Sequence, residues 1–210
     1  MLFVILFEFH YHQNGCQLQD FQLFLILVHC YQFSYSQVSD DFSDADFNSN
    51  PCWSGDTTDF MVNSVKQLQL HAAAAGTSTL TTAVDLSGID TIEWDIYIEL
   101  AFSPSSQNNT KYYLYSTQNN FANADGYYLQ FGESGSNDAI QFYKQSGNVN
   151  ALLGRGVDAR VASAFGVSTK VVKYPNGLIE IYTDYTGGNN YQLEFFVNDN
   201  MNLGNGYLGW

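Results

Sequence analysis

The chain has 210 residues, of which 45% are apolar and 16% aromatic, a composition that provides for one domain with a real core and argues against disorder. Only 13% are charged and Lys and Arg together number 7, which excludes long solvent-exposed helices. The formal net charge of −14 disfavours nucleic acid and anionic lipid as partners. The charged residues are replaced by Asn, Gln, Ser, Thr, Gly and Tyr, and such a composition is typical of an all-β protein.

The first predicted element is a signal sequence over residues 1–36. Phe21–Val28 has the length of the apolar region of a signal peptide, is too short to span a bilayer, and is followed by the small-x-small pattern Ser34-Tyr35-Ser36. The sequence therefore predicts a secreted or cell-surface protein without a membrane span, whose mature part begins at or near Gln37. The basic region expected before the apolar run is absent. No Met lies between Met1 and Met61, and a misassigned start codon would account for the first twenty residues, which a signal peptide does not need.

The three cysteines do not form a framework in the predicted mature part. Cys16 and Cys30 fall in the predicted signal sequence, and His29 disfavours lipidation of Cys30 because a small residue is wanted there. Cys52 then remains alone, which excludes a disulfide or zinc pattern. Beside Trp53, it is predicted to be a small buried residue.

From Gln37 onward the sequence predicts short strands separated by turns, and no helix longer than one turn. Pro175-Asn176-Gly177 is a predicted hairpin turn, because Asn-Gly supplies the positive φ that tight turns need. Ser134–Asp138 and Ser146–Asn150 are predicted hairpin loops. The predicted strands are Phe60–Asn63, Gln67–Leu70, Ser78–Thr82, Thr91–Phe102, Lys111–Thr117, Gly126–Phe131, Ala139–Gln145, Ser168–Tyr174, Leu178–Asp184 and Gln192–Asn198.

The segment Glu93–Leu100 (EWDIYIEL) is the strongest predicted strand. Trp94, Ile96, Ile98 and Leu100 fall on one face, and acidic residues with one Tyr fall on the other. This alternation is typical of a sheet with one face in a core, so Trp94 is expected to be buried. About ten such strands without helical crossovers predict one antiparallel two-sheet β-sandwich or jelly roll over residues 37–210.

The start of the predicted mature chain, Val38–Phe60, resembles the opening of concanavalin A-like or laminin-G-like β-sandwich modules in exported bacterial surface proteins. The likeness continues through Gln67–Leu70, the Trp94 strand, Gly126–Leu129 and Tyr182–Gly188. The matching residues at the start are Asp40, Asp41, Phe42, Ser43, Asp44, Asp46, Phe47, Pro51, Trp53, Gly55, Asp56 and Phe60.

The resemblance implies a concanavalin A-like jelly roll that forms part of a larger multidomain protein. In such modules one or two further strands follow a segment like Gly206–Trp210, so the domain is expected to be truncated at its C-terminus.

The acidic start of the predicted domain is a candidate metal site. Asp40, Asp41, Asp44 and Asp46 supply the hard oxygen ligands that calcium prefers, although the spacing is not that of an EF-hand. The alternative is a solvated edge anchored to the core by neighbouring Phe residues. A structural calcium ion is the one cofactor that the sequence suggests.

The acidic residues of the Trp94 strand raise the question of catalysis. Retaining glycosidases with the concanavalin A-like fold use two carboxylates about 5–5.5 Å apart on such a strand. Along a regular strand Asp95 and Glu99 lie about 13 Å apart, and Glu93 and Glu99 about 20 Å. The spacing therefore predicts no working pair and no catalytic residue. No nucleophile elbow, P-loop or dinucleotide fingerprint is present either, and Gly154-Arg155-Gly156 is predicted to be a loop and not a phosphate cradle.

Tyr and Gln residues form the remaining candidate site. If Leu129 and Phe142 face the core, the residues next to them in the two strands face outward. Together with Tyr97, these Tyr and Gln side chains would form one exposed sheet face. Aromatic rings stack on sugars, and amides exchange hydrogen bonds with hydroxyls, although ordinary cross-strand packing is the alternative. The candidate ligand-binding residues are Tyr97, Tyr128, Gln130, Gln141 and Tyr143.

These observations favour an exported, lectin-like, non-catalytic recognition module that binds carbohydrate or another cell-surface polymer. The alternatives are a structural spacer or adhesion domain without a small ligand and, in third place, a glycoside hydrolase. An aromatic, exposed sheet face would distinguish binding from a spacer role, and a close carboxylate pair in a groove would distinguish an enzyme.

Overall fold

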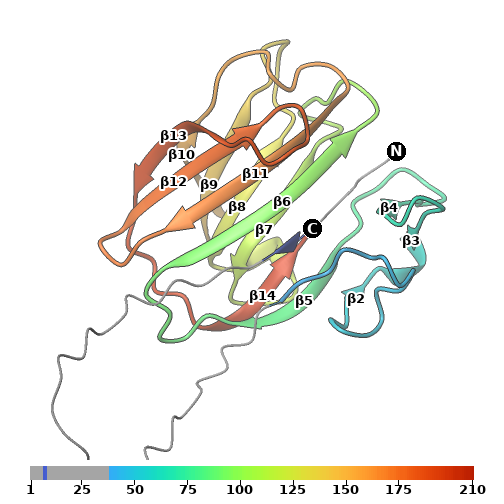
Figure 1. The fold of residues 1–210 in the computed structure, drawn as a ribbon, viewed down its shortest axis with the longest axis horizontal. Coiled ribbons are helices and arrows are strands. Elements are labelled where there is room, and N and C mark those ends of the chain that lie inside the picture. The colour runs from blue at the N-terminus through green and yellow to red at the C-terminus, as the bar shows by residue number, and fades with distance from the viewer. Residues whose placement is uncertain (1–6, 9–37) are drawn as a thin grey trace, which may run out of the picture.

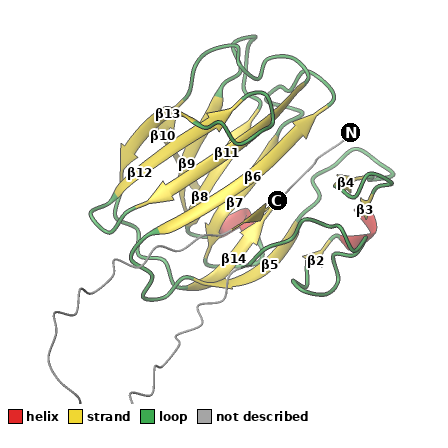
Figure 2. Cartoon of the chain, in the orientation of Figure 1, coloured by secondary structure: helices red, strands yellow, loops and turns green. Residues whose placement is uncertain are grey.

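The computed structural model describes residues 7–8 and 38–210, and it is an antiparallel β-sandwich (Figures 1 and 2). Two large sheets lie face to face, and a two-stranded hairpin lies beside them. Within the described part of the chain the only helices are two single 3-10 turns, η1 (Thr57–Asp59) and η2 (Phe121–Asn123). The all-β, antiparallel fold class predicted from the sequence is confirmed.

The five-stranded sheet carries the long strand predicted around Trp94. In spatial order it contains β1 (Phe7–Glu8), β6 (Ile92–Leu100), β11 (Phe165–Lys173), β12 (Leu178–Asp184) and β13 (Gln192–Asn198). The β6–β11 pair is the longest in the sheet, running from Ile92 opposite Lys173 to Leu100 opposite Phe165. Strand β1, which lies within the predicted signal sequence, pairs with β6 through two residues.

The seven-stranded sheet forms the second layer of the sandwich. Its order is β10 (Val149–Arg155), β9 (Ile140–Ser146), β8 (Gly126–Phe131), β7 (Thr110–Ser116), β14 (Asn205–Gly209), β5 (Leu80–Asp85) and β2 (Ser54–Gly55). Strands β3 (Phe60–Val62) and β4 (Leu68–Leu70) form the separate hairpin. A long loop, residues 71–79, leads from β4 back into β5.

One hydrophobic core joins the inner faces of the two sheets. Trp94, with 1% of its surface exposed, lies in it with the other apolar residues of β6, so its predicted burial is confirmed. Rings from the opposite sheet, including Phe131 and Phe142, belong to the same core. The segment before β2 is joined to the sandwich by the buried Trp53, whose ring centroid lies 5.0 Å from that of Trp210. The Trp53 indole also donates a 2.8 Å hydrogen bond to the buried Asp40 carboxylate of the same segment.

Three local predictions are corrected by the structure. Strand β10 begins at Val149, inside the predicted loop Ser146–Asn150, because Gly147 at φ +59° allows a tighter turn than five residues would make. The same strand includes Gly154 and Arg155, which read as a loop in the sequence. Cys52 is exposed, since its neighbour Trp53 takes the buried position and adjacent extended residues point in opposite directions.

The predicted apolar run Phe21–Val28 and the cleavage site before Gln37 lie outside the described residues, so export stays a prediction. Within the described residues, no helix has the length and apolar character needed to cross a membrane.

Candidate functional site: a groove on the outer face of the seven-stranded sheet

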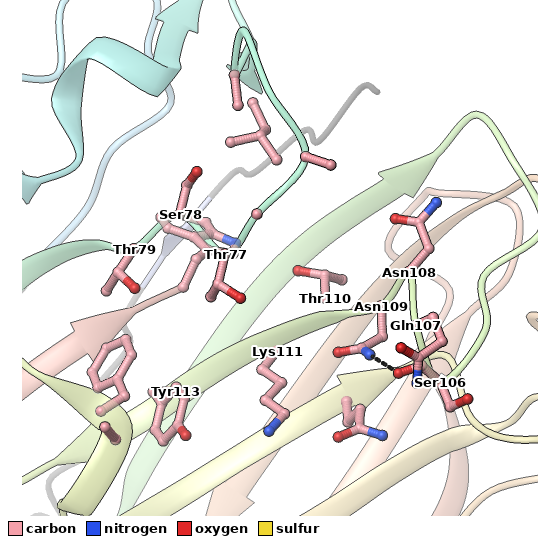
Figure 3. A pocket seen from close by; sticks show the side chains of 18 of the residues that line it. Thr77, Ser78, Thr79, Ser106, Gln107, Asn108, Asn109, Thr110, Lys111 and Tyr113 are labelled. Atoms are coloured by element: carbon pink, nitrogen blue, oxygen red, sulfur yellow. Dashed lines mark hydrogen bonds between the residues drawn. The ribbon is translucent and has the colours of Figure 1, made fainter.

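A groove of about 1340 Å³ lies over the outer face of the seven-stranded sheet. Its floor is formed by outward-facing residues of β7, β8 and β9, and the residue 71–79 loop and the Ser106–Asn109 segment form two walls (Figure 3). Lys111 and Tyr113 lie between these walls in Figure 3. One wall carries the hydroxyl groups of Thr77, Ser78 and Thr79 beside the small residues of the segment 72–76, and the other carries the hydroxyl and amide groups of Ser106–Asn109.

Two rows of side chains cross the strands of the floor, because the antiparallel register sets them directly opposite one another. The first row is polar: Lys111 pairs with Gln130, Gln130 with Gln141, and Gln141 with Arg155 of β10. Gln141 accepts a 3.3 Å hydrogen bond from the Gln130 amide and donates a 2.8 Å bond to Glu133. The row therefore presents amides whose positions are fixed by neighbouring side chains.

The second row is aromatic and consists of Tyr113, Tyr128 and Tyr143 in register on β7, β8 and β9. Their ring centroids lie 4.9 and 5.0 Å apart, close to the spacing of the strands, and Phe121 of η2 extends the row with a ring 3.9 Å from that of Tyr113. The Tyr128 and Tyr143 rings are stacked, as are those of Phe121 and Tyr113. We call these four residues the aromatic ladder.

Two tyrosines of the aromatic ladder direct their hydroxyl groups toward polar side chains. Tyr113 donates to Gln145 at 2.6 Å, and Tyr128 donates to Asn150 at 3.1 Å. Burial raises the pKa of Tyr113 to about 12 and raises that of Tyr143 as well, so both phenols stay neutral at physiological pH. A neutral phenol both donates and accepts hydrogen bonds, as a sugar hydroxyl does.

Four of the five candidate ligand-binding residues therefore lie together, in two directly opposed pairs: Tyr128 with Tyr143 and Gln130 with Gln141. Tyr128 is only 1% exposed, because Tyr113 and Lys111 of β7 and Tyr143 of β9 surround its ring, so it supports the ladder and its faces are not open to a ligand. Their role in binding stays a prediction.

Tyr97 does not share this face. It lies on β6, in the other sheet, where its hydroxyl donates to Glu99 at 3.2 Å. The alternation of β6 indicates correctly that Tyr97 points away from the core, but alternation within one strand does not identify which sheet the strand joins.

Residues that the sequence did not single out complete the groove. Lys111 and Tyr113 share β7 with the buried Tyr112 and Leu114, and their outward direction is visible in the alternation of the sequence up to Tyr113. Beyond it, a register shift between Tyr113 and Tyr115 turns Tyr115 into the core, which hides the pattern.

The four Asp side chains at the start of the domain bond to local groups and do not converge on one metal site. Asp40 accepts hydrogen bonds from the Trp53 indole and the Phe42 amide, and burial raises its pKa despite both. Asp41, Asp44 and Asp46 each accept a hydrogen bond from the amide two residues ahead. Among residues 7–8 and 38–210 no three Asp, Glu, His or Cys side chains gather into a metal-binding group. Calcium at this segment stays a prediction without a converging ligand set.

The acidic residues of β6 are engaged with partners in their own sheet. Lys170 of β11 lies 2.5 Å from a Glu93 carboxylate oxygen and 3.3 Å from one of Asp95. The opposite sheet carries the groove. In the part of the chain that the structure describes, Glu133 is the only carboxylate that lines the groove, and its carboxylate pairs with Arg155.

Comparison with known proteins adds no assignment: no family model, no curated protein and no solved structure matches this chain.

Proposed function

We propose that this chain is an exported, non-catalytic recognition module of the concanavalin A-like type, and that the groove on its seven-stranded sheet binds a carbohydrate chain. The observation that carries the proposal is the chemistry of the groove floor. Fixed amides and neutral phenols lie in register over three strands, between walls to which Thr77–Thr79 and Ser106–Asn109 add hydroxyl and amide groups. Sugar hydroxyls both donate and accept hydrogen bonds, and this surface offers both kinds of partner.

The ladder modifies the expected mode of recognition. Because its rings stack on one another, most of their faces are occupied, and the ligand would meet ring edges and hydroxyls together with the outer part of Tyr143. Hydrogen bonds rather than ring stacking then supply most of the binding. Because each such bond contributes little in water, the affinity should lie in the range of about micromolar to millimolar.

The size of the groove fits a polymer better than a single small molecule. Its volume of about 1340 Å³ exceeds the range of roughly 300–1,000 Å³ that is usual for small-ligand pockets. A ligand of several sugar units, or the equivalent length of another hydroxyl-rich cell-surface polymer, would use both walls.

A structural spacer and a glycoside hydrolase are the competing functions. A spacer needs no groove of this kind. A hydrolase needs two carboxylates flanking one bond, about 5–5.5 Å or 6.5–9.5 Å apart, and Glu133 is the only groove carboxylate among the described residues. Recognition without catalysis is therefore the function that the geometry supports best.

The test is a glycan array followed by calorimetry on the full chain. Gln130→Leu and Tyr143→Ala should each weaken binding of any captured glycan about tenfold, since each removes hydrogen-bonding groups from the floor. Tyr182→Ala is the matched control, because this partly buried Tyr lies on β12 in the other sheet. Thermal unfolding would check that each variant folds. Capture of no glycan, or binding unchanged by both groove substitutions, would favour the spacer function.

A further inference from the structure

Among the described residues, Lys111 is the only Lys or Arg that lines the groove, and it has no acidic partner there. Its ammonium group makes no ion pair or hydrogen bond to any residue of the described chain, whereas Lys144, Arg155 and Lys170 each pair with a carboxylate. The Lys111 ammonium group makes a cation–π contact with the Tyr128 ring, whose centroid lies 4.9 Å away. Burial lowers the pKa of Lys111, and no carboxylate counteracts that effect. Such a partly buried, unpaired charge costs stability.

The surroundings of Lys111 are unusual for this protein. The chain has 21 acidic residues and a net charge of −14, yet Lys111 and Glu133 are the only Lys, Arg, Asp or Glu residues that line the groove in the described residues. Glu133 already forms an ion pair with Arg155, which also pairs with Asp158. Among the described residues that line the groove, Lys111 thus carries the one charge that no ion pair neutralises.

The position of Lys111 also suits contact with a ligand. It begins the polar row of the floor, opposite Gln130, and it extends between Tyr113 and the Ser106–Asn109 wall (Figure 3). Its ammonium group can donate three hydrogen bonds, and the hydroxyls and amides around it are neutral. A negatively charged group that entered the groove would meet Lys111 without first displacing a carboxylate of the protein.

We propose that the ligand of the groove is an anionic glycan, and that its carboxylate or sulfate binds the Lys111 ammonium group while its hydroxyls bind the amide row. This inference rests on the proposed function and narrows it to sugars that carry a negative charge. The contact with the Tyr128 ring holds the ammonium over the floor in the absence of ligand, because a cation is attracted to an aromatic face.

The experiment compares charged and neutral forms of the same glycan. Calorimetry at low salt would measure binding of the full chain to oligogalacturonate and to its methyl ester, and to a sulfated galactan oligosaccharide and its desulfated form. These pairs also distinguish a carboxylate from a sulfate ligand. For at least one pair the charged form should bind about tenfold more tightly. A tenfold change in affinity corresponds to about 1.4 kcal/mol, close to the contribution of one charge-assisted hydrogen bond.

Substitutions of Lys111 assign this preference to the side chain. Lys111→Met and Lys111→Gln should abolish the preference and bring both forms to the affinity of the neutral one, and Lys111→Arg should retain it. Lys173→Met is the matched control, because Lys173 is also partly buried, its pKa is also lowered by burial, and it lies on β11 in the other sheet.

The possible results separate the two proposals. Equal binding of charged and neutral forms, or a preference that survives Lys111→Met, would overturn the anionic-ligand inference. If neutral glycan binding were still lost in Gln130→Leu, the proposed function would stand without the inference. Failure of the wild-type chain to bind any of the four glycans and every glycan of the array would overturn both.

Discussion

At the scale of single residues, strand alternation decides which aromatic rings reach the core. Trp94 and Tyr97 belong to the same strand, and their positions of opposite parity place the first in the core and the second outside it. The same rule separates Leu129 from Gln130 and Phe142 from Tyr143. For these residues the sequence alone was sufficient, because a strand with one buried face leaves only one register in which the apolar residues are covered.

Replacement of Trp94 by Ala should destabilise the protein by about 3–5 kcal/mol, since it removes a buried ring and leaves a cavity. The measurement is the midpoint of denaturant unfolding. Phe196→Ala is the control, because Phe196 belongs to the same sheet and is 61% exposed, so its loss should cost much less. Similar midpoint shifts for the two variants would contradict the assignment of the faces of β6.

At the scale of elements, most strands follow from composition and turn chemistry, and the exceptions have local causes. β8, β12 and β13 have the predicted bounds, because clear turn residues end each of them. β10 was missed because Gly154 and Arg155 look like a loop, and the strand indeed carries a register shift between Leu152 and Gly154. A bulge moves one residue out of the alternation, so a pattern of period two cannot reveal it.

Pairing between strands also sets the electrostatics of the five-stranded sheet, where Lys170 of β11 lies between Glu93 and Asp95 of β6. Burial raises the pKa of Asp95, and the Lys170 charge opposes that rise. Burial works to lower the pKa of Lys170, but its hydrogen bond to Glu93 and the charges of Asp95 and Glu93 raise it overall. The Lys170 cation therefore favours the ionised form of Asp95 against the effect of burial.

Lys170→Met should lower the free energy of unfolding at pH 7 by about 1–3 kcal/mol, between the values for exposed and buried ion pairs. Without the cation the pKa of Asp95 rises further. A carboxyl group whose folded pKa is raised contributes stability below its unfolded pKa, and that stability is lost as the pH rises through the folded value. The deficit of the variant should therefore shrink as the pH falls toward about 4, near the unfolded pKa of Asp.

Unfolding midpoints of the wild type and the variant at pH 7 and pH 4 would measure this effect. Lys66→Met serves as the control, because it changes the net charge equally at an exposed residue between β3 and β4. A deficit of the same size at both pH values would show that Lys170 acts through packing of its side chain and not through Asp95.

At the scale of the whole molecule, what could not be predicted was the assignment of strands to sheets. Local sequence places Tyr97, Tyr128 and Tyr143 on outward faces, but the pairing of β6 with β11 and of β8 with β7 and β9 separates the first from the other two. That pairing depends on contacts between residues far apart in the sequence, such as Trp94 of β6 opposite Val171 of β11. The sequence therefore predicts the outward-facing residues of the groove floor, but not the two segments that form its walls.

This separation of the two outer faces leads to the prediction that the chain does not hydrolyse glycans. Glu93, Asp95 and Glu99 lie on the five-stranded sheet, and the groove lies over the other one, where Glu133 is the only lining carboxylate in the described part of the chain. Glycoside hydrolysis needs an acid and a second carboxylate on either side of the same bond, and Glu133 is held by Arg155 and by the Gln141 amide.

Prolonged incubation of the full chain with β-glucan, galactan or polygalacturonate should release no reducing sugar above a blank without protein. Glu133→Gln and Glu93→Gln should leave that result unchanged. Release of sugar by the wild type that disappeared in Glu133→Gln would place an enzyme in the groove, and release that disappeared in Glu93→Gln or Glu99→Gln would place one on the face of β6.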